Sequence, residues 1–174
     1  QAPARAGSAA PTSEDDRRMI ITVTLNAAID KTLAVPNFRL GRRHRTVEQT
    51  TLAGGKGDNV ARALEALGQP VIATGFTGGP TGTRIVEQLT EESILCDFVR
   101  IREEARTNTA VIDTTTNEQT EIHERAPAVS ERAVAQLIDR AADYGLPAKP
   151  AGFAAGVPGV HLGAHTTPVR RRND

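Results

Sequence analysis

Hydrophobic residues in this 174-residue chain fall into short runs that are separated by amphipathic stretches. Runs rich in β-branched and aliphatic residues are typical of strands, and a Thr- and Asn-rich turn between the last two predicts a hairpin. Residues 31–51 alternate weakly between apolar and polar positions around Pro36 and Gly41, which predicts two exposed strands. The other expected strands are 20–25, 71–76, 95–101, 107–113 and 119–123.

Three stretches carry apolar residues at the spacing of an amphipathic helix: 56–67, 83–92 and a stretch that follows a serine cap at Ser130. The alternation of strands and helices predicts a parallel sheet with crossover helices, and the additional short strands predict a small second layer at its edge. The residues expected to face inward are Val60, Ala63, Leu64 and Leu67 in the first helix, Ile85, Val86 and Leu89 in the second, and Val134, Leu137 and Ile138 in the third.

Both ends of the chain differ in composition from its middle. Residues 1–18 are mostly Ala, Pro, Ser and charged residues without apolar periodicity, which predicts a disordered N-terminal extension before Met19. Residues 19–143 carry the expected strands and helices and are interpreted as one domain. Residues 144–174 show no helix or strand periodicity, which predicts an irregular tail that is either a solvated linker or a segment translated out of frame.

Charge and cysteine content narrow the classes of function. Lys and Arg total 21, as do Asp and Glu, and this balance argues against nucleic acid or an anionic membrane surface as a partner. The single cysteine, Cys96, excludes an internal disulfide and a cysteine-based zinc site, and it is consistent with a cytoplasmic protein. No apolar run reaches the roughly 20 residues that a membrane-spanning helix requires.

The most informative motif is a glycine turn that leads into the first helix, GGKGDNVA at residues 54–61. Such a turn exposes backbone N–H groups to an anion or a sugar hydroxyl. Asp30, Lys56 and Asn59 are residue types that bind polyols and phosphates. Taken alone, the motif is equally compatible with a tight loop, and Asp30 with a residue that ends a strand.

Three motifs in order, TLNAAIDK at 24–31, GGKGDNVAR at 54–62 and RTN at 106–108, resemble the PfkB group of ribokinase-like sugar kinases. The similarity is strongest to the 1-phosphofructokinase and tagatose-6-phosphate kinase branch and runs from about residue 19 to residue 137. It implies an α/β fold, a ribokinase-like parallel-sheet sandwich with a small β-sheet lid. It also implies phosphoryl transfer from ATP with Mg²⁺ to a small-molecule sugar phosphate, and a lid that often forms homodimers in this family.

The resemblance also implies roles for individual residues. Asp30 and Asn59 are expected to bind sugar hydroxyls, and Gly54 and Gly55 to let the backbone approach the sugar closely. An alternative for Arg106 is an exposed charge beside Glu103 and Glu104, and Arg62 and Glu65 are expected to lie on a solvated helix face. Arg106 and Asn108, together with Lys56, are expected to bind the substrate phosphate. The expected substrate site therefore consists of Asp30, Gly54, Gly55, Lys56, Asn59, Arg106 and Asn108.

The chain also departs from the family pattern. Ala27 stands where proline is common, and Asp58 stands where the family has an apolar residue, so a buried carboxylate there would need a partner. The family's C-terminal Gly-Ala-Gly-Asp motif, with its catalytic aspartate, has no counterpart after residue 137, and most of the ATP-binding residues are missing too. Gly55–Asp58 only imitates that motif, so we assign no catalytic residue and no metal ligand.

The expected function is therefore that of the sugar-binding portion of a fructose-1-phosphate-type kinase, truncated at the C-terminus and inactive alone. A non-catalytic sugar-phosphate-binding or vestigial fragment is the alternative, and a nucleoside kinase of the same fold is a third. A phosphate clamp at Arg106 suits a phosphorylated acceptor better than a nucleoside. The motifs do not separate fructose 1-phosphate, fructose 6-phosphate and tagatose 6-phosphate.

Overall fold

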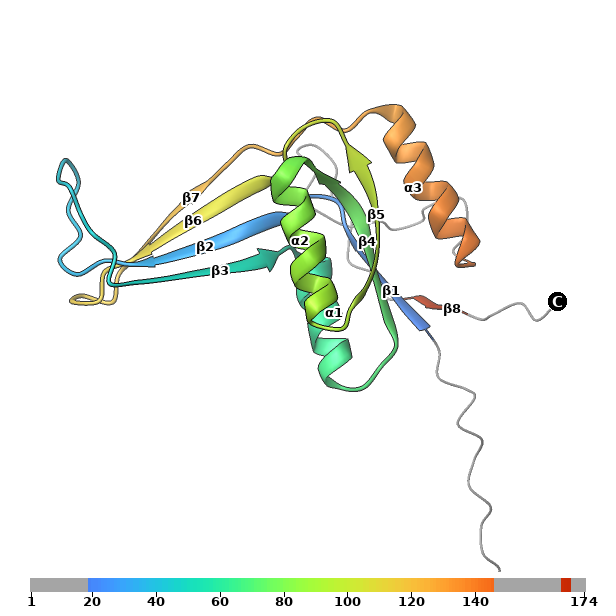
Figure 1. Ribbon diagram of the computed structural model, residues 1–174, viewed down its shortest axis with the longest axis horizontal. Coiled ribbons are helices and arrows are strands. Elements are labelled where there is room, and N and C mark those ends of the chain that lie inside the picture. The colour runs from blue at the N-terminus through green and yellow to red at the C-terminus, as the bar shows by residue number, and fades with distance from the viewer. Residues whose placement is uncertain (1–18, 146–166, 170–174) are drawn as a thin grey trace, which may run out of the picture.

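The computed structural model describes residues 19–145 and 167–169, which form two four-stranded sheets and three helices. The body of the protein holds the first sheet and the helices, and the second sheet extends from it as an arm (Figure 1). The strands are β1 (Met19–Thr24), β2 (Ala28–Ala34), β3 (Glu48–Gly54), β4 (Val71–Gly78), β5 (Leu95–Ile101), β6 (Arg106–Ile112), β7 (Gln119–His123) and β8 (Thr167–Val169). The helices are α1 (Lys56–Ala66), α2 (Gly79–Glu91) and α3 (Glu131–Asp143).

The first sheet has the strand order β5-β4-β1-β8. β1 pairs in parallel with β4, and β4 pairs in parallel with β5, as expected for strands joined by crossover helices. β8 pairs antiparallel with the first half of β1. The sequence did not predict β8, since only three residues pair and no alternation of apolar and polar residues marks them.

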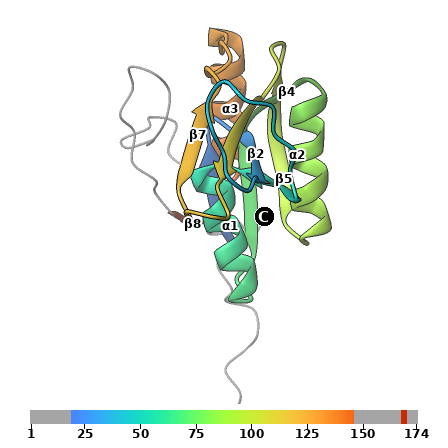
Figure 2. The ribbon, with the colours of Figure 1, turned by 90° about the vertical axis from the view of Figure 1, so that its left-hand side faces the viewer.

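Helices cover both faces of this sheet, as the view in Figure 2 shows for α2 and α3. Phe98 and Val99 are neighbours on β5 and therefore point to opposite faces. Phe98 packs with Ile85 and Leu89 of α2 in the larger buried cluster. Val99 packs with Leu137 of α3 in the smaller one. The inward residues expected for the second helix are thus confirmed for Ile85 and Leu89.

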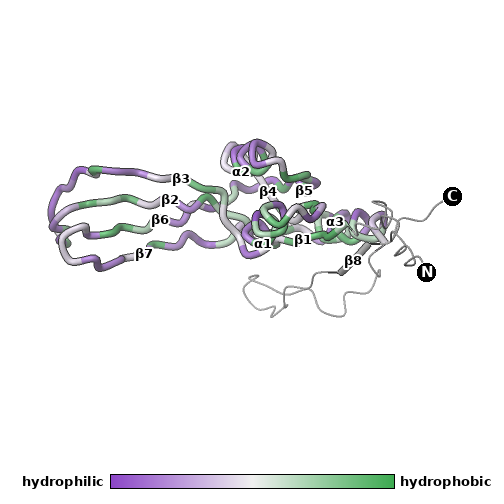
Figure 3. Tube along the Cα trace, turned by 90° about the horizontal axis from the view of Figure 1, so that it is seen from below, coloured by the Kyte–Doolittle hydropathy of each residue, from purple (hydrophilic) through white to green (hydrophobic). Residues whose placement is uncertain are grey.

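The second sheet has the order β3-β2-β6-β7, and it forms the separate layer predicted from the short strands (Figures 1 and 3). β2 lies antiparallel to β3 and parallel to β6, and β6 and β7 form the expected hairpin. Hydrophilic and hydrophobic positions alternate along these strands in Figure 3. Only the near ends of β2 and β3 pack against α2, where Ile29 and Ala53 join Ile85 and Leu89 in the larger buried cluster. At the end of this sheet that lies far from the body, the Asp113 carboxylate accepts hydrogen bonds from the backbone N–H groups of Asn37 and Phe38 and stabilises the loop there.

The inward faces expected for two helices were right only in part. In α1 the buried residues are Gly57, Asp58 and Ala61; of the expected residues, Leu64 packs against the larger buried cluster, whereas Leu67 is 75% exposed. Small residues let α1 lie close to the sheet, so a search for large apolar side chains misses most of its buried face. In α3 Leu137 is buried as expected, whereas Val134 is 42% exposed, and the other buried positions are Ala133 and Ala141.

α2 begins at Gly79, four residues before the expected start. The segment was interpreted as a turn because of its glycines and Pro80, yet proline is well tolerated in the first turn of a helix, where its missing N–H is not needed. The Glu104 carboxylate accepts a hydrogen bond from the N–H of Thr81 and satisfies a donor at this helix start.

Within residues 19–145 and 167–169, no helix is long and apolar enough to cross a membrane. The predicted disordered extension, residues 1–18, lies outside the described residues, as does most of the predicted irregular tail.

Candidate substrate site

Six of the seven expected substrate-binding residues line one hollow of about 230 Å³. It lies where the end of β1, the N-terminus of α1 and the first residues of β2 and β6 meet. Residues from 30 to 108 come together here because β2 and β6 run in parallel and both begin beside the body of the protein. The lining residues from the expected site are Asp30, Gly55, Lys56, Asn59, Arg106 and Asn108.

A chain of hydrogen bonds joins three of these side chains. The amide nitrogen of Asn108 donates to Asp30 Oδ1 at 2.8 Å, and these two residues are direct partners in the β2–β6 register. Arg106 Nη1 donates to Asn108 Oδ1 at 3.0 Å, and Nη2 reaches the carbonyl of Asn26 at 3.4 Å. These hydrogen bonds hold the Arg106 guanidinium and the Asp30 carboxylate side by side. They leave Asp30 Oδ2 without a hydrogen bond among the described residues.

Arg106 is therefore not the exposed charge that the alternative interpretation proposed. Its side chain is half-buried, and its Nε is buried without a hydrogen-bond partner among the described residues. The two nearby glutamates bind elsewhere: Glu104 accepts from the N–H of Thr81, and Glu103 accepts from the N–H of Ala128. A cation that is held at a hollow without a carboxylate partner is suited to bind an anion.

Gly54 does not line the hollow and lies against Asp30 instead. A Cβ at residue 54 would lie 2.0 Å from Asp30 Oδ2, because Gly54 pairs with Ala28 across the β2–β3 ladder. Real Cβ atoms do not approach other atoms so closely, so the missing side chain makes room for the Asp30 carboxylate.

We predict that Gly54→Ala weakens ligand binding about fivefold, because the Asp30 side chain must rotate away and lose one hydrogen bond of about 1 kcal/mol to the ligand. The measurement is titration calorimetry with a sugar phosphate, together with thermal unfolding. Gly41→Ala is the control for affinity, since a Cβ there has no heavy atom within 4 Å and residue 41 does not line the hollow. Its φ of +74° strains an alanine, so Gly41→Ala should unfold at a lower temperature while its affinity stays unchanged. Equal affinity for Gly54→Ala and the unmodified protein would contradict this role.

The glycine turn and the start of α1 present backbone donors to the hollow. Gly55 is the N-cap residue of α1, with φ of 140°, a conformation that side chains rarely allow. It makes no side-chain cap, and the first hydrogen bond within the helix is from the N–H of Asn59 to the carbonyl of Gly55. The preceding N–H groups are therefore available to an anion beside Lys56.

Asp58 lies behind the turn and is completely buried. Its Oδ1 accepts a hydrogen bond of 2.8 Å from the hydroxyl of Thr24, whereas Oδ2 has no partner among the described residues. Burial raises the pKa of this carboxyl group to about 6, against the opposing effects of the Thr24 hydrogen bond and the nearby Arg62. The sequence predicted that a charge here would need a partner, and the structure supplies a partner for one oxygen only.

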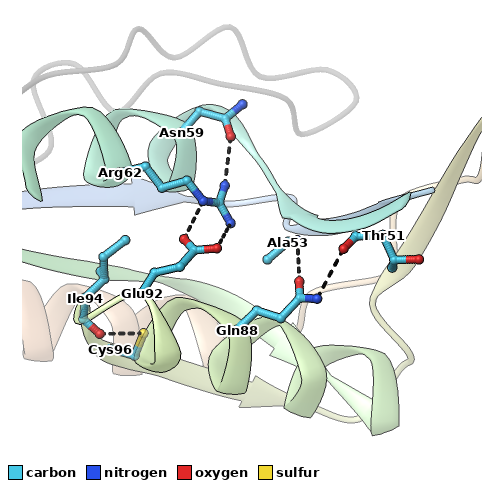
Figure 4. Close-up of polar contacts among 8 residues, drawn as sticks. All are labelled: Thr51, Ala53, Asn59, Arg62, Gln88, Glu92, Ile94 and Cys96. Atoms are coloured by element: carbon cyan, nitrogen blue, oxygen red, sulfur yellow. Dashed lines mark hydrogen bonds and ion pairs between the residues drawn. The ribbon is translucent and has the colours of Figure 1, made fainter. Parts of the chain in front are cut away.

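Another group of polar residues lies between α1 and the end of α2 (Figure 4). Arg62 binds Glu92 through both Nε and Nη2, and its Nη1 donates to Asn59 Oδ1 at 3.0 Å. The expectation that Arg62 lies on a solvated face was wrong, since its side chain is only 20% exposed. Glu65 is exposed as expected. Sequence reasoning missed this contact because residues 62 and 92 lie on different helices.

The resemblance also implies ATP and Mg²⁺. Among residues 19–145 and 167–169, no three His, Cys, Asp or Glu side chains gather in a way that could hold a metal ion. Of the two carboxylates beside the glycine turn, Asp58 is buried against Thr24, whereas Asp30 lines the hollow. With Asp30, Lys56 and Arg106 in its lining, the hollow has groups for a phosphorylated polyol.

Comparison with known proteins identifies the family of this chain. The family model of the pfkB family carbohydrate kinases matches residues 21–146. The chain belongs to this family. The family and the ribokinase-like α/β fold predicted from the sequence are both confirmed.

Solved structures of pfkB relatives superpose on the described fold. A protein from Thermotoga maritima, described as a possible 1-phosphofructokinase, is 37% identical with a TM-score of 0.65, over 70% of this chain and 40% of that one. Phosphofructokinase-2 from Escherichia coli in complex with fructose-6-phosphate is 28% identical with a TM-score of 0.68, over 72% of this chain and 42% of that one. The chain therefore spans about two fifths of the length of these proteins.

Proposed function

We propose that this chain binds a sugar phosphate and provides the acceptor-binding portion of an ATP-dependent sugar-phosphate kinase of the fructose 1-phosphate to fructose 1,6-bisphosphate type. The observation that carries the proposal is the chain of hydrogen bonds from Arg106 through Asn108 to Asp30 at one hollow. These hydrogen bonds place the Arg106 guanidinium, which has no carboxylate partner among the described residues, beside the Asp30 carboxylate. The Oδ2 atom of Asp30 accepts no hydrogen bond among these residues and is available to a ligand. A sugar phosphate needs this combination, because its phosphate requires a cation and its hydroxyls require acceptors.

In this proposal Arg106 and Lys56 bind the phosphate already present on the substrate, and the N–H groups of the glycine turn add further donors. Asp30 Oδ2 accepts a hydrogen bond from a sugar hydroxyl and so fixes the orientation of the ring. Asn59 reaches the substrate from the rim of the hollow. Positioning of the two reactants accounts for much of phosphoryl-transfer catalysis, and these residues position one of them.

Asp58 is not the catalytic base in this proposal. A general base must come within hydrogen-bonding distance of the hydroxyl that it deprotonates. The Asp58 carboxylate is buried behind Gly55, whose hypothetical Cβ would lie 2.8 Å from Asp58 Oδ2, so the backbone of the turn separates it from the hollow. Its fixed contact is with Thr24. The phosphoryl group itself would come from Mg²⁺-bound ATP.

We also propose a cytoplasmic protein that pairs through the second sheet. Exposed apolar side chains on its strands support this, namely Leu52 on β3 and Ile122 on β7, which are 44% and 61% exposed. Every residue of β7 is exposed along a sheet edge that has no partner strand among the described residues.

The proposal is tested by titrating the purified 174-residue chain with fructose 1-phosphate, fructose 6-phosphate and tagatose 6-phosphate in the absence of ATP. We expect binding of at least one of them and no binding of the unphosphorylated sugar. With ATP and Mg²⁺ added, we expect no formation of the bisphosphate. Detectable ATP-dependent phosphorylation would contradict the predicted inactivity, and binding without turnover is also the result expected of the non-catalytic alternative. Failure to bind any phosphorylated sugar would contradict both.

A further inference from the structure

The side chain of Asn59 has a fixed direction at the rim of the hollow. Arg62 Nη1 lies 3.0 Å from Asn59 Oδ1. A guanidinium has only donors, so the atom that faces it must be the amide oxygen, and the amide nitrogen must point the other way. Figure 4 shows this nitrogen directed away from Arg62, and it makes no hydrogen bond within the part of the chain that the structure describes.

Arg62 is in turn held by the end of the next helix. Its Nε donates to Glu92 Oε2 at 2.5 Å and its Nη2 donates to Glu92 Oε1 at 3.2 Å. Glu92 is the C-cap residue of α2, so its backbone is anchored by the helix that precedes it. Because the guanidinium is planar, a two-point contact with the carboxylate also fixes the direction of Nη1. This fixed direction is what orients the Asn59 amide.

We infer that Arg62 is a positioning residue for substrate binding, and that it commits Asn59 to donate to an acceptor oxygen of the ligand. The inference rests on the proposed function, since it concerns the same hollow. It also makes the expected role of Asn59 more specific, since the sequence predicted only that this residue binds a sugar hydroxyl. With Oδ1 turned toward Arg62, the amide nitrogen is the group of Asn59 that faces away from the guanidinium, and it donates to a phosphate oxygen or to the lone pair of a hydroxyl oxygen.

Two variants separate this positioning role from simple stabilisation of the fold. Arg62→Met removes the donor that orients Asn59 and also leaves Glu92 unpaired. The exchange of both charges, Arg62→Glu with Glu92→Arg, restores an ion pair between the helices but places a carboxylate beside Asn59. A carboxylate has only acceptors, so the Asn59 amide must reverse and present its oxygen to the hollow.

The experiment uses the full 174-residue chain and has two readouts. Calorimetric titration with fructose 6-phosphate and with fructose 1-phosphate measures affinity, and nuclear magnetic resonance relaxation of the Asn59 side-chain amide measures its mobility. We expect affinity to fall about fivefold to tenfold in Arg62→Met, the value of one hydrogen bond. In the charge exchange we expect at least the same loss, with a thermal unfolding midpoint closer to that of the unmodified protein.

Arg100→Met is the matched control, because Arg100 donates to the hydroxyl of Thr83 on α2 and lies outside the hollow. Its affinity should be unchanged. Unchanged affinity in both Arg62 variants, or an Asn59 amide that is as mobile in the unmodified protein as in Arg62→Met, would overturn the inference. If the unmodified chain binds neither sugar phosphate, the proposed function fails, and the relaxation of the Asn59 amide alone decides whether Arg62 orients it.

Discussion

Raising the pH from 4 to 8 is expected to lower the free energy of unfolding by about 2 to 3 kcal/mol through one carboxyl group, that of Asp58. Burial raises the pKa of Asp58 from 3.8 to about 6 in the folded protein. The folded state therefore holds this proton to a higher pH than the unfolded state does. Stability from this group is fully present below pH 3.8 and is lost as the pH rises through 6, where a carboxylate with an unpartnered Oδ2 forms in the interior.

The measurement is urea-induced unfolding at a series of pH values, compared between the unmodified protein and Asp58→Asn. Asparagine can still accept the hydrogen bond from Thr24 but cannot ionise, so the difference between the two profiles isolates Asp58. Other groups oppose the trend at acid pH, since hydrogen bonds lower the pKa of Glu104, Asp113 and Glu121, but both proteins share them. Asp139→Asn, an exposed residue of α3, is the control. Parallel profiles for Asp58→Asn and the unmodified protein would rule out the buried charge.

Arg106→Met is expected to weaken sugar-phosphate binding by a factor of about 30 to 1,000, which corresponds to roughly 2 to 4 kcal/mol for a charged hydrogen-bonded contact with the phosphate. The loss has two sources. The cation disappears, and Asn108 loses the donor that keeps its amide nitrogen directed at Asp30. Arg106→Met therefore removes the phosphate contact and also loosens the Asp30 carboxylate, which accepts from the sugar hydroxyl.

Calorimetry with a sugar phosphate measures this effect, and the ionic strength must be held constant because the contact is electrostatic. Arg106→Lys should give an intermediate affinity, since lysine restores the charge without the planar fork. Arg102→Met is the matched control, because Arg102 is an exposed arginine four residues earlier and does not line the hollow. If Arg106→Met binds as tightly as Arg102→Met, Arg106 does not hold the phosphate.

Local sequence patterns predicted most elements of the fold because strands and helices impose different periodicities on apolar residues. The strands 95–101 and 119–123 begin and end where expected, and the helix after Ser130 has the expected cap, with the Ser130 side chain accepting from the N–H of Ala133. The predicted start of α2 was wrong, and the buried face of α1 was predicted only in part, for the same reason. Both depend on glycine, alanine and proline, whose contribution is close approach or fixed backbone geometry rather than apolar area.

The candidate site was likewise predicted only in part from the sequence. The residue types and their order along the chain were sufficient to select six of the residues that line the hollow, since each motif lies at the end or start of an element. No sequence pattern indicated that Gly54 makes room for Asp30, because the two residues are 24 positions apart and meet only in the register of β2 and β3.

The sequence by itself thus determined the family, the order of all elements except β8, and the residue types that line the candidate site. Only the tertiary structure decided which atoms are engaged and which remain available: Asp30 Oδ2 and the amide nitrogen of Asn59 are free of hydrogen bonds among the described residues, whereas Asn59 Oδ1 is bound to Arg62. The physical reason is that periodicity and capping act over a few neighbouring residues. Hydrogen-bond partners such as Arg62 and Glu92 are set by strand register and helix packing across the fold.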